Sequence, residues 1–203
     1  MKLLLATHND HKRREFARLL PGHEISLLPD DFELPPEDGE TFEQNALGKA
    51  RAAAALAESI GACAIADDSG IEAQALGGAP GVRSARFAGE HASDQQNLGK
   101  LLAEAPAGSR LRYVCALVLV EPQEGLEKVF LGYCEGTLAA APRGERGFGY
   151  DPAFIPNERP YAQVGSSGGA EELTMAQLTD AQKDEISHRG RAVRGLDEWL
   201  AQR

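Results

Sequence analysis

Short apolar runs alternate with amphipathic segments along the first third of the chain. Lys2–Ala6 is apolar and predicts a buried strand, and Lys12–Leu20 has apolar residues at helical spacing. Ile25–Leu28 indicates another short strand. The alanine-rich segment Thr41–Glu58 opens with a capping-box pattern and predicts a long helix, and the apolar run Ala62–Ala66 follows it as the next strand.

Two long β-rich runs occupy the middle of the chain. They cover Arg110–Val120 and Lys128–Leu138, and the turn-like stretch between them predicts a hairpin. Helical spacing returns in Asp94–Ala103 and in Thr179–Gln202, where we expect one or two helices, and Ala153–Ile155 indicates a short strand. Helices that alternate with strands beside a hairpin predict an α/β fold with a mixed sheet.

Composition narrows the choice of partners. The 203 residues are 42% hydrophobic, which is enough for one sizeable core, and no repeat or linker is apparent, so we expect a single domain over residues 1–203. The net charge of −10 repels a phosphate backbone, so nucleic acid is not an expected partner, whereas a small nucleotide in a locally basic pocket stays compatible. No run is long enough for a membrane span or a signal segment, so we expect no membrane partner. The three cysteines lie in apolar runs, which favours buried free thiols and a cytoplasmic location.

Two adjacent carboxylates follow the apolar run at Cys63–Ala66. Asp67 and Asp68 come at the expected end of this strand and precede Ser69 and Gly70. Open α/β sheets bind ligands at the carboxyl ends of strands, and neighbouring carboxylates repel each other unless a cation or a proton relieves them. The pair therefore suggests a divalent-metal site or an acid/base pair. Asp-Ser-Gly is also good turn chemistry, and taken alone the segment slightly favours a turn.

Two polar segments near the N-terminus carry groups suited to phosphate and metal. Thr7–Lys12 lies between the first strand and the first helix, where backbone N–H groups and the positive helix end face an anion, although a simple helix cap explains it equally well. Asn45 and Lys49 are four residues apart and share a helix face that could meet a phosphate. Glu37 offers the hard oxygen that Mg²⁺ prefers. Taken alone, a solvated loop and a surface lysine explain this second segment more simply.

Two segments nearer the C-terminus carry groups suited to a purine. Gly147–Pro152 places glycines beside Phe148 and Tyr150, which allows a flat ring to approach the backbone and stack, although an ordinary turn is the commoner reason for this pattern. His188 and Arg189 are donors that could read a purine carbonyl, although taken alone they fit a positively charged helix end.

In combination, these segments resemble the inosine triphosphate pyrophosphatase family over nearly the whole chain. Each motif is weak alone, but together they occur in the order that the family shows. They are Thr7-x-Asn9-x-x-Lys12, Glu37-x-Gly39, Thr41-Phe42 with Asn45-Ala46 and Lys49-Ala50, Ala66-Asp-Asp-Ser-Gly70, Leu76-Gly-Gly-Ala-Pro-Gly81, Ser84-Ala-Arg86, Gly147-Phe-Gly-Tyr-Asp-Pro152 and Ser187-His-Arg-Gly190.

The resemblance implies an elongated α/β fold, in which helices flank a mixed β-sheet and two lobes enclose an active-site cleft between them. It also implies a Mg²⁺-dependent homodimer that hydrolyses ITP, dITP and XTP to the monophosphate and pyrophosphate, and so keeps abnormal purines out of DNA and RNA. Residues that would bind the phosphates or touch the substrate beside them are Thr7, His8, Asn9, Asp10, His11, Lys12, Lys49 and Ser69. The metal site would include Glu37, Asp67 and Asp68, and Asp68 would also be the catalytic proton acceptor. The base pocket would be formed by Phe148, Gly149, Tyr150, Asp151, Lys183, His188 and Arg189.

The chain departs from the family pattern in two places. His8 stands where a small residue is common, and the connection Asn157–Met175 is longer and richer in glycine than usual. Two other functions stay open. A nucleotide-binding regulatory module without catalysis would lack the three predicted metal carboxylates, which are present here. A pyrophosphatase for a modified pyrimidine triphosphate would not need the purine-carbonyl donors His188 and Arg189.

Overall fold

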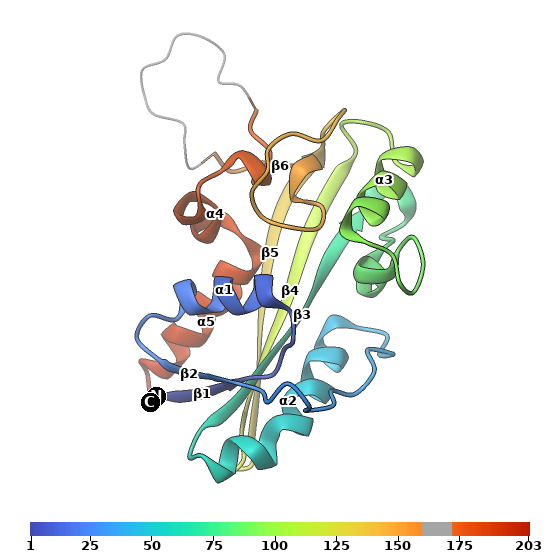
Figure 1. Ribbon diagram of the computed structural model, residues 1–203. Coiled ribbons are helices and arrows are strands. Elements are labelled where there is room, and N and C mark those ends of the chain that lie inside the picture. The colour runs from blue at the N-terminus through green and yellow to red at the C-terminus, as the bar shows by residue number, and fades with distance from the viewer. Residues whose placement is uncertain (160–171) are drawn as a thin grey trace, which may run out of the picture. The chain divides into compact units, whose positions relative to one another are not determined.

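Six strands form one mixed sheet in the computed structural model, which describes residues 1–159 and 172–203 (Figure 1). The strands are β1 (Lys2–Leu5), β2 (Glu24–Leu27), β3 (Cys63–Ala73), β4 (Arg110–Glu121), β5 (Leu126–Leu138) and β6 (Phe154–Pro156). Their order in the sheet is β2-β1-β3-β4-β5-β6. β1 runs parallel to both β2 and β3, whereas β5 and β6 are antiparallel, so the predicted mixed α/β sheet is confirmed.

Polar caps start the helices close to the positions that the sequence predicts. The helices are α1 (Asp10–Leu19), α2 (Phe42–Ser59), α3 (Asp94–Glu104), α4 (Asp180–Ile186) and α5 (His188–Leu200). The Thr41 hydroxyl accepts a bond from the Gln44 amide at the start of α2, as the capping box requires. The reciprocal bond differs, because the Gln44 side chain accepts from the amide of Glu40 rather than from that of Thr41.

The chain divides into two compact units, each assembled from separate segments. Unit 1 contains residues 1–69, 115–132 and 189–203, and unit 2 contains residues 70–114 and 133–188. The strands β3, β4 and β5 contribute residues to both units. Since no linker separates the units along the chain, the sequence shows no boundary between them.

The core of unit 1 forms where α1 and α5 meet the sheet. Phe16 of α1 and Leu196 of α5 belong to one buried cluster with Leu3 and Leu5 of β1. Leu4 is also buried but faces away from this cluster, as the two-residue period of a strand requires. The long helix α2 contacts β1 and buries a row of alanines, whose small side chains allow a close approach.

Unit 2 has a separate core. It gathers Ile71 of β3, Leu101 of α3, Leu111 of β4 and Phe154 of β6 with buried residues from the C-terminal part of the unit. The Tyr113 and Phe154 rings pack with centroids 4.6 Å apart. Buried residues of the loop before β6 and of α4, such as Tyr150 and Ile186, also belong to this core.

Strand β3 is longer than the sequence predicts. The expectation that it ends at Ala66 was wrong, because it continues to Ala73, and Asp67, Asp68 and Ser69 are strand residues rather than a turn. Alternation along a strand places Asp67 and Ser69 on one face and Asp68 on the other. Buried carboxylates are tolerated inside a strand only where cations or donors meet them, and the structure supplies both.

Three further expectations concern the thiols, the membrane and the connection after Asn157. All three cysteines are free and buried, as predicted. Within residues 1–159 and 172–203, none of the helices has the length and apolar character of a membrane span. Most of the connection Asn157–Met175 lies outside the described residues, so its departure from the family pattern stays untested.

Candidate functional site

The polar segment after β1 forms the N-terminal cap of α1. The Asn9 side chain accepts bonds from the amides of His11 and Lys12, at 2.9 and 3.1 Å, and the Thr7 hydroxyl accepts from the amide of Asn9. Thr7 is buried, whereas His8, Asn9, Asp10 and His11 are exposed. The segment is therefore a helix cap, and it also places the Lys12 ammonium beside β3.

Asp67 is a fully buried carboxylate surrounded by cations. Lys12 Nζ lies 3.0 Å from its Oδ1, and Arg189 Nη2 donates to its Oδ2 at 2.9 Å. Burial alone would raise the pKa of Asp67, but the attraction of Lys12 and Arg189 outweighs it and holds that pKa well below its usual range. The Asp67 carboxylate is therefore ionised, and both of its oxygens face protein cations.

Asp68 faces α2 on the other side of the strand. Asn45 Nδ2 donates to its Oδ2 at 2.8 Å, and the Ser69 amide donates to its Oδ1 at 2.9 Å. Burial raises the pKa of Asp68, and the attraction of Lys49 offsets this only in part. Two donors thus fix the direction of a carboxylate that holds its proton more readily than an exposed aspartate.

Lys49 joins β3 to the acidic loop before α2. Its ammonium donates to the Asp67 carbonyl at 2.8 Å and forms an ion pair with the Glu37 carboxylate. Burial alone would lower the pKa of Lys49, but Glu37 and Asp67 outweigh it and raise that pKa. Burial alone would raise the pKa of Glu37, but the attraction of Lys49 outweighs burial and lowers that pKa. Lys49 is therefore a buried, charged group and not the surface lysine of the simpler interpretation.

Arg189 belongs to the same cluster in unit 1. Its guanidinium is fully buried and donates to Asp67 through Nε and Nη2, to the Ser69 hydroxyl at 2.8 Å, and to the Glu15 carboxylate through Nη1. The structure thus groups Arg189 with the residues predicted to bind phosphate and metal. The other residues predicted for the base pocket belong to unit 2.

Asp151 is the centre of the site residues in unit 2. Lys183 Nζ donates to its Oδ2 at 2.6 Å, the Phe148 amide donates to the same oxygen at 3.0 Å, and the Tyr113 hydroxyl donates to Oδ1 at 3.1 Å. A Cβ atom at Gly147 would lie 2.0 Å from Oδ2, so the loop needs glycine there to reach the carboxylate. Asp151 is buried and therefore organises the loop rather than facing solvent.

Four aromatic side chains belong to this group in unit 2. The His188 imidazole stacks on Tyr113, and the Lys183 ammonium lies 5.1 Å from the centroid of the half-buried Phe148 ring. Tyr150 is buried and donates to the Ser84 carbonyl at 2.8 Å, and burial raises its pKa. Phe148 is thus the most exposed of these rings, while Tyr150 holds the loop to the core.

The predicted residues form two groups, and sequence reasoning missed one member of each. Glu15 pairs with Arg189 in unit 1, and Tyr113 contacts both Asp151 and His188 in unit 2. The available signal for Glu15 was its place beside Phe16 on the apolar face of a helix, where a carboxylate needs a partner. The sequence around Tyr113 is an apolar run, and nothing in it distinguishes a tyrosine of the site from an ordinary core tyrosine.

The carboxylates near Lys49 fit a magnesium ion in part. Glu37 and Asp68 supply hard oxygen ligands, and the Glu37 charge acts on the pKa of Asp68, so the two groups are close. Within the described part of the chain, no cluster of three or more acidic, histidine or cysteine side chains suits a metal. Mg²⁺ commonly takes one or two carboxylates and completes its shell with substrate phosphates and water, so two are sufficient.

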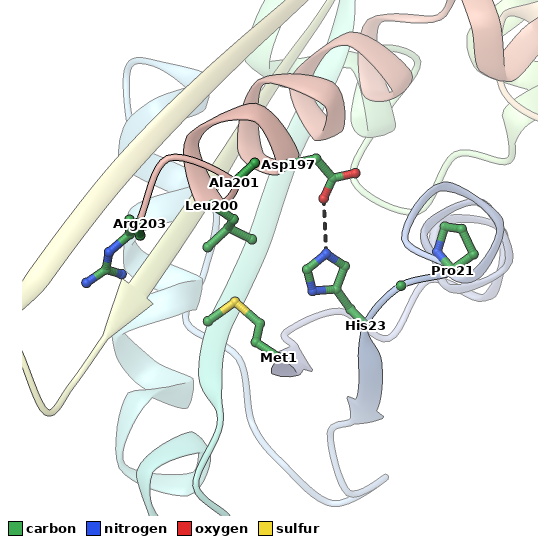
Figure 2. Close-up of a pocket in the computed structure, with 8 residues that line it drawn as sticks. Met1, Pro21, His23, Asp197, Leu200, Ala201 and Arg203 are labelled. Atoms are coloured by element: carbon green, nitrogen blue, oxygen red, sulfur yellow. Dashed lines mark hydrogen bonds and ion pairs between the residues drawn. The ribbon is translucent and has the colours of Figure 1, made fainter.

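Unit 1 also has a hollow that none of the predicted residues lines. It has a volume of about 560 Å³, and Figure 2 shows its lining around Met1, Pro21, His23, Asp197 and Leu200. The His23 imidazole Nε2 lies 3.1 Å from the Asp197 carboxylate across this hollow. His23 is therefore half-buried and paired with Asp197.

Strand β3 of the mixed α/β sheet thus carries two adjacent carboxylates, Asp67 and Asp68, beside the ammonium groups of Lys12 and Lys49. The chain belongs to the Ham1 family, whose model matches residues 3–199. A dITP/XTP pyrophosphatase of Corynebacterium glutamicum (strain R) is 42% identical, over all of this chain and 98% of that protein. One of Bacillus subtilis (strain 168) is 40% identical, over 97% of this chain and 96% of that protein. The solved structure of a HAM1 protein from Coxiella burnetii superimposes with a TM-score of 0.79 at 36% identity and covers all of both chains.

Proposed function

We propose that this chain hydrolyses abnormal purine nucleoside triphosphates, namely ITP, dITP and XTP, to the monophosphate and pyrophosphate, and so clears them from the nucleotide pool. The observation that carries the proposal is Asp68, a carboxylate fixed by two donors next to the buried ammonium of Lys49. The relatives named dITP/XTP pyrophosphatase support the same reaction. Buried free thiols support a cytoplasmic setting.

The phosphates are assigned to the cations of unit 1. Lys12 and Lys49 both donate to the Asp67 carbonyl, at 3.4 and 2.8 Å, so their ammonium groups converge on one point of β3. Asp67 holds this pair of positive charges in place without substrate. A triphosphate that binds here meets cations already oriented, and pyrophosphate leaves against the same charges.

Asp68 is the proposed proton acceptor. A raised pKa makes a carboxylate a better base at neutral pH, because proton transfer to it becomes more favourable. Asn45 and the Ser69 amide fix its oxygens, so the base does not rotate away from an attacking water. Asp68 then takes a proton from the water that attacks the α-phosphorus.

Mg²⁺ is proposed as the cofactor, held by Glu37 and Asp68 together with the phosphates of the substrate. When bound, it supplies a Lewis acid that neutralises phosphate charge. The third carboxylate predicted for the metal, Asp67, has its oxygens directed at Lys12 and Arg189. We therefore assign to Asp67 the role of counter-ion for these cations.

The purine is assigned to unit 2. Phe148 offers a half-buried ring for stacking, and His188 and Lys183 offer donors to a 6-oxo group, which hypoxanthine and xanthine carry and adenine lacks. A site built to hydrogen-bond one group rejects an analogue without it by a factor of about 10⁴ or more. Arg189, predicted for the same role, would first have to release Asp67 and Ser69.

A homodimer is proposed on the pattern of β5. Its large side chains Val129, Leu131 and Tyr133 are 40%, 43% and 37% exposed at alternate positions of the strand, and so lie on one face. Such a row commonly marks an interaction surface. Light scattering on the wild type and on Leu131→Glu tests the proposal, because the variant should be monomeric at concentrations where the wild type is a dimer. A monomeric wild type would overturn it.

The reaction is tested by supplying ITP, XTP, dITP, ATP and GTP separately in the presence of Mg²⁺. Pyrophosphate and orthophosphate are both assayed. We expect pyrophosphate from ITP, XTP and dITP, little product from ATP, which lacks the 6-oxo group, and no product with Asp68→Asn. Orthophosphate as the first product would mean that the other anhydride bond is cleaved. Tight ITP binding without turnover would instead favour the regulatory module.

A further inference from the structure

We propose that Glu15 is a positioning residue of the active site, which acts on Asp68 through Arg189 and β3. The inference concerns the same reaction and therefore rests on the proposed pyrophosphatase function. Glu15 lies on α1, one turn after Lys12, and neither the sequence motifs nor the family pattern described above draws attention to it.

Glu15 is a buried carboxylate whose position needs an explanation. Only 6% of the residue is exposed, beside Phe16 in the core between α1 and α5. An ionised carboxylate is expensive to bury unless a cation meets it in good geometry. The Arg189 guanidinium meets this requirement through Nη1, while its other nitrogens donate to Asp67 and Ser69.

These groups form a chain of alternating charges. Glu15 contacts Arg189, Arg189 contacts Asp67, and Asp67 contacts Lys12. Because Lys12 and Glu15 are three residues apart on α1, the chain begins and ends on the same helix. The three ion pairs therefore tie α1, α5 and β3 into one ring, which the backbone of α1 closes between Lys12 and Glu15.

The ring acts on the residues at both sides of Asp68. Arg189 holds the side chains of Asp67 and Ser69, which lie on one face of β3, while Asp68 points to the other face and bonds Asn45. A strand fixed from one face at positions 67 and 69 has little freedom at position 68. Arg189 thus determines where the Asp68 carboxylate points, without touching it.

Glu15 determines where Arg189 lies. The guanidinium donates to Glu15 on one side and to Asp67 on the other, so the two carboxylates together fix its position. With only one of these carboxylates, the attraction on Arg189 would be one-sided. Without the charge of Glu15, Arg189 is expected to shift toward Asp67. That shift would move β3 at positions 67 and 69 and change the direction of Asp68.

The test uses the full-length protein with Mg²⁺ and dITP, well below the melting temperature of each variant. Glu15→Gln keeps the size of the side chain and removes its charge, and Glu15→Asp keeps the charge on a shorter arm. We expect Glu15→Gln to lower kcat by about 10- to 100-fold, the range that a misplacement of about 1 Å can produce. KM should change less than kcat, because the phosphate cations are retained. Glu15→Asp should recover part of kcat although it leaves a small void.

Two further variants separate positioning from stability. Leu20→Val removes a methylene from the buried residue at the C-terminal cap of α1, and should lower the melting temperature with kcat unchanged. Glu15→Gln combined with Arg189→Lys should lose little more than the more severe single variant, because both act through one path. A kcat for Glu15→Gln within twofold of wild type, or losses that multiply in the double variant, would overturn the proposal. An inactive wild type would instead overturn the pyrophosphatase function, and this proposal with it.

Discussion

The Tyr113 ring lies flat against the His188 imidazole, with centroids 4.6 Å apart and planes 7° from parallel. The Tyr113 hydroxyl also donates to Asp151, so one side chain connects two of the predicted base-binding residues. The stack and the hydrogen bond together orient His188, which the sequence analysis predicted as a site residue. Tyr113, which provides both contacts, was not predicted.

Substitutions at Tyr113 separate the ring from the hydroxyl. Tyr113→Phe keeps the stack and removes one bond to Asp151, at a cost in stability of about 1.5–3 kcal/mol for a hydrogen bond to a charged group. Tyr113→Leu also removes the stack, so the ratio of kcat/KM for ITP over ATP should fall further in this variant. Equal ratios in the two variants would show that the stack does not support base selection.

Gly147→Ala should disturb the loop that carries Phe148. The glycine has φ 73°, and a methyl group would collide with Asp151 at 2.0 Å. Gly108 has φ 80° in open space, so Gly108→Ala measures the backbone cost alone, about 1–2 kcal/mol. Thermal unfolding should show a larger loss for Gly147→Ala, accompanied by a higher KM for ITP. Equal losses in the two variants would contradict the predicted collision.

Asp67→Asn should destabilise the protein in a pH-dependent way. Breaking a buried ion pair costs about 3–5 kcal/mol, because Arg189 and Lys12 lose their shared counter-ion. The folded pKa of Asp67 is depressed, so its stabilisation is present above the ordinary pKa of 3.8 and is lost as the pH falls toward the folded value. The difference in melting temperature from wild type should therefore hold from about pH 8 to pH 5 and narrow below about pH 4.

A matched control for Asp67→Asn is Asp10→Asn, which removes an exposed carboxylate that pairs with Arg13 at the surface. Exposed pairs contribute about 0–1 kcal/mol, so this variant should melt close to wild type across the same pH range. If the difference in melting temperature between wild type and Asp67→Asn instead grows as the pH falls, the ionised state assigned to Asp67 is contradicted.

Magnesium dependence should distinguish Glu37 from Asp67. Activity should disappear with a chelator and return with added Mg²⁺. Glu37→Gln should raise the Mg²⁺ concentration that gives half-maximal rate, because it removes a proposed ligand. Asp67→Asn should lower the rate and leave this concentration close to that of wild type. An unchanged Mg²⁺ requirement in Glu37→Gln would remove Glu37 from the metal site.

The thiols should be inert in the folded protein. Burial, with the Asp67 charge nearby, raises the pKa of Cys115 to about 12, so almost no reactive thiolate exists at neutral pH. Burial also raises the pKa of Cys63. A thiol reagent such as Ellman's should therefore label none of the three cysteines quickly in the native state and all three after unfolding. Rapid labelling of Cys115 would show that the core of unit 1 opens easily.

Local patterns predicted most of the fold. The helical spacing before Leu20, the capping threonine at Thr41 and the two β-rich runs each specify an element through neighbours in sequence, and each of these elements is present. The end of β3 was misplaced, because Asp67 and Asp68 resemble a turn unless their partners are known. Those partners lie far along the chain, and Arg189 follows Asp67 by 122 residues.

The site was predicted less completely than the fold, for a related reason. The motifs identified Lys12, Lys49 and Asp68 as members of a site, but motifs carry no information on which charges pair. Arg189 and His188 are adjacent in sequence and were assigned one role, yet the guanidinium bonds Asp67 and the imidazole stacks on Tyr113. Neighbours in sequence can thus serve different groups, and only the three-dimensional arrangement separates them.

The ring of ion pairs also affects how the chain folds during its synthesis on the ribosome. Arg189 follows Glu15 by 174 residues, so a ribosome releases both carboxylates of the ring long before the cation that joins them. Until then, Glu15 lacks the cation that it pairs with in the folded protein and Asp67 lacks one of its two cations, so burial of both carboxylates in the core is unfavourable. The nascent N-terminal half is therefore expected to stay open, and a protease added to stalled chains should cut it readily until the final helix has emerged.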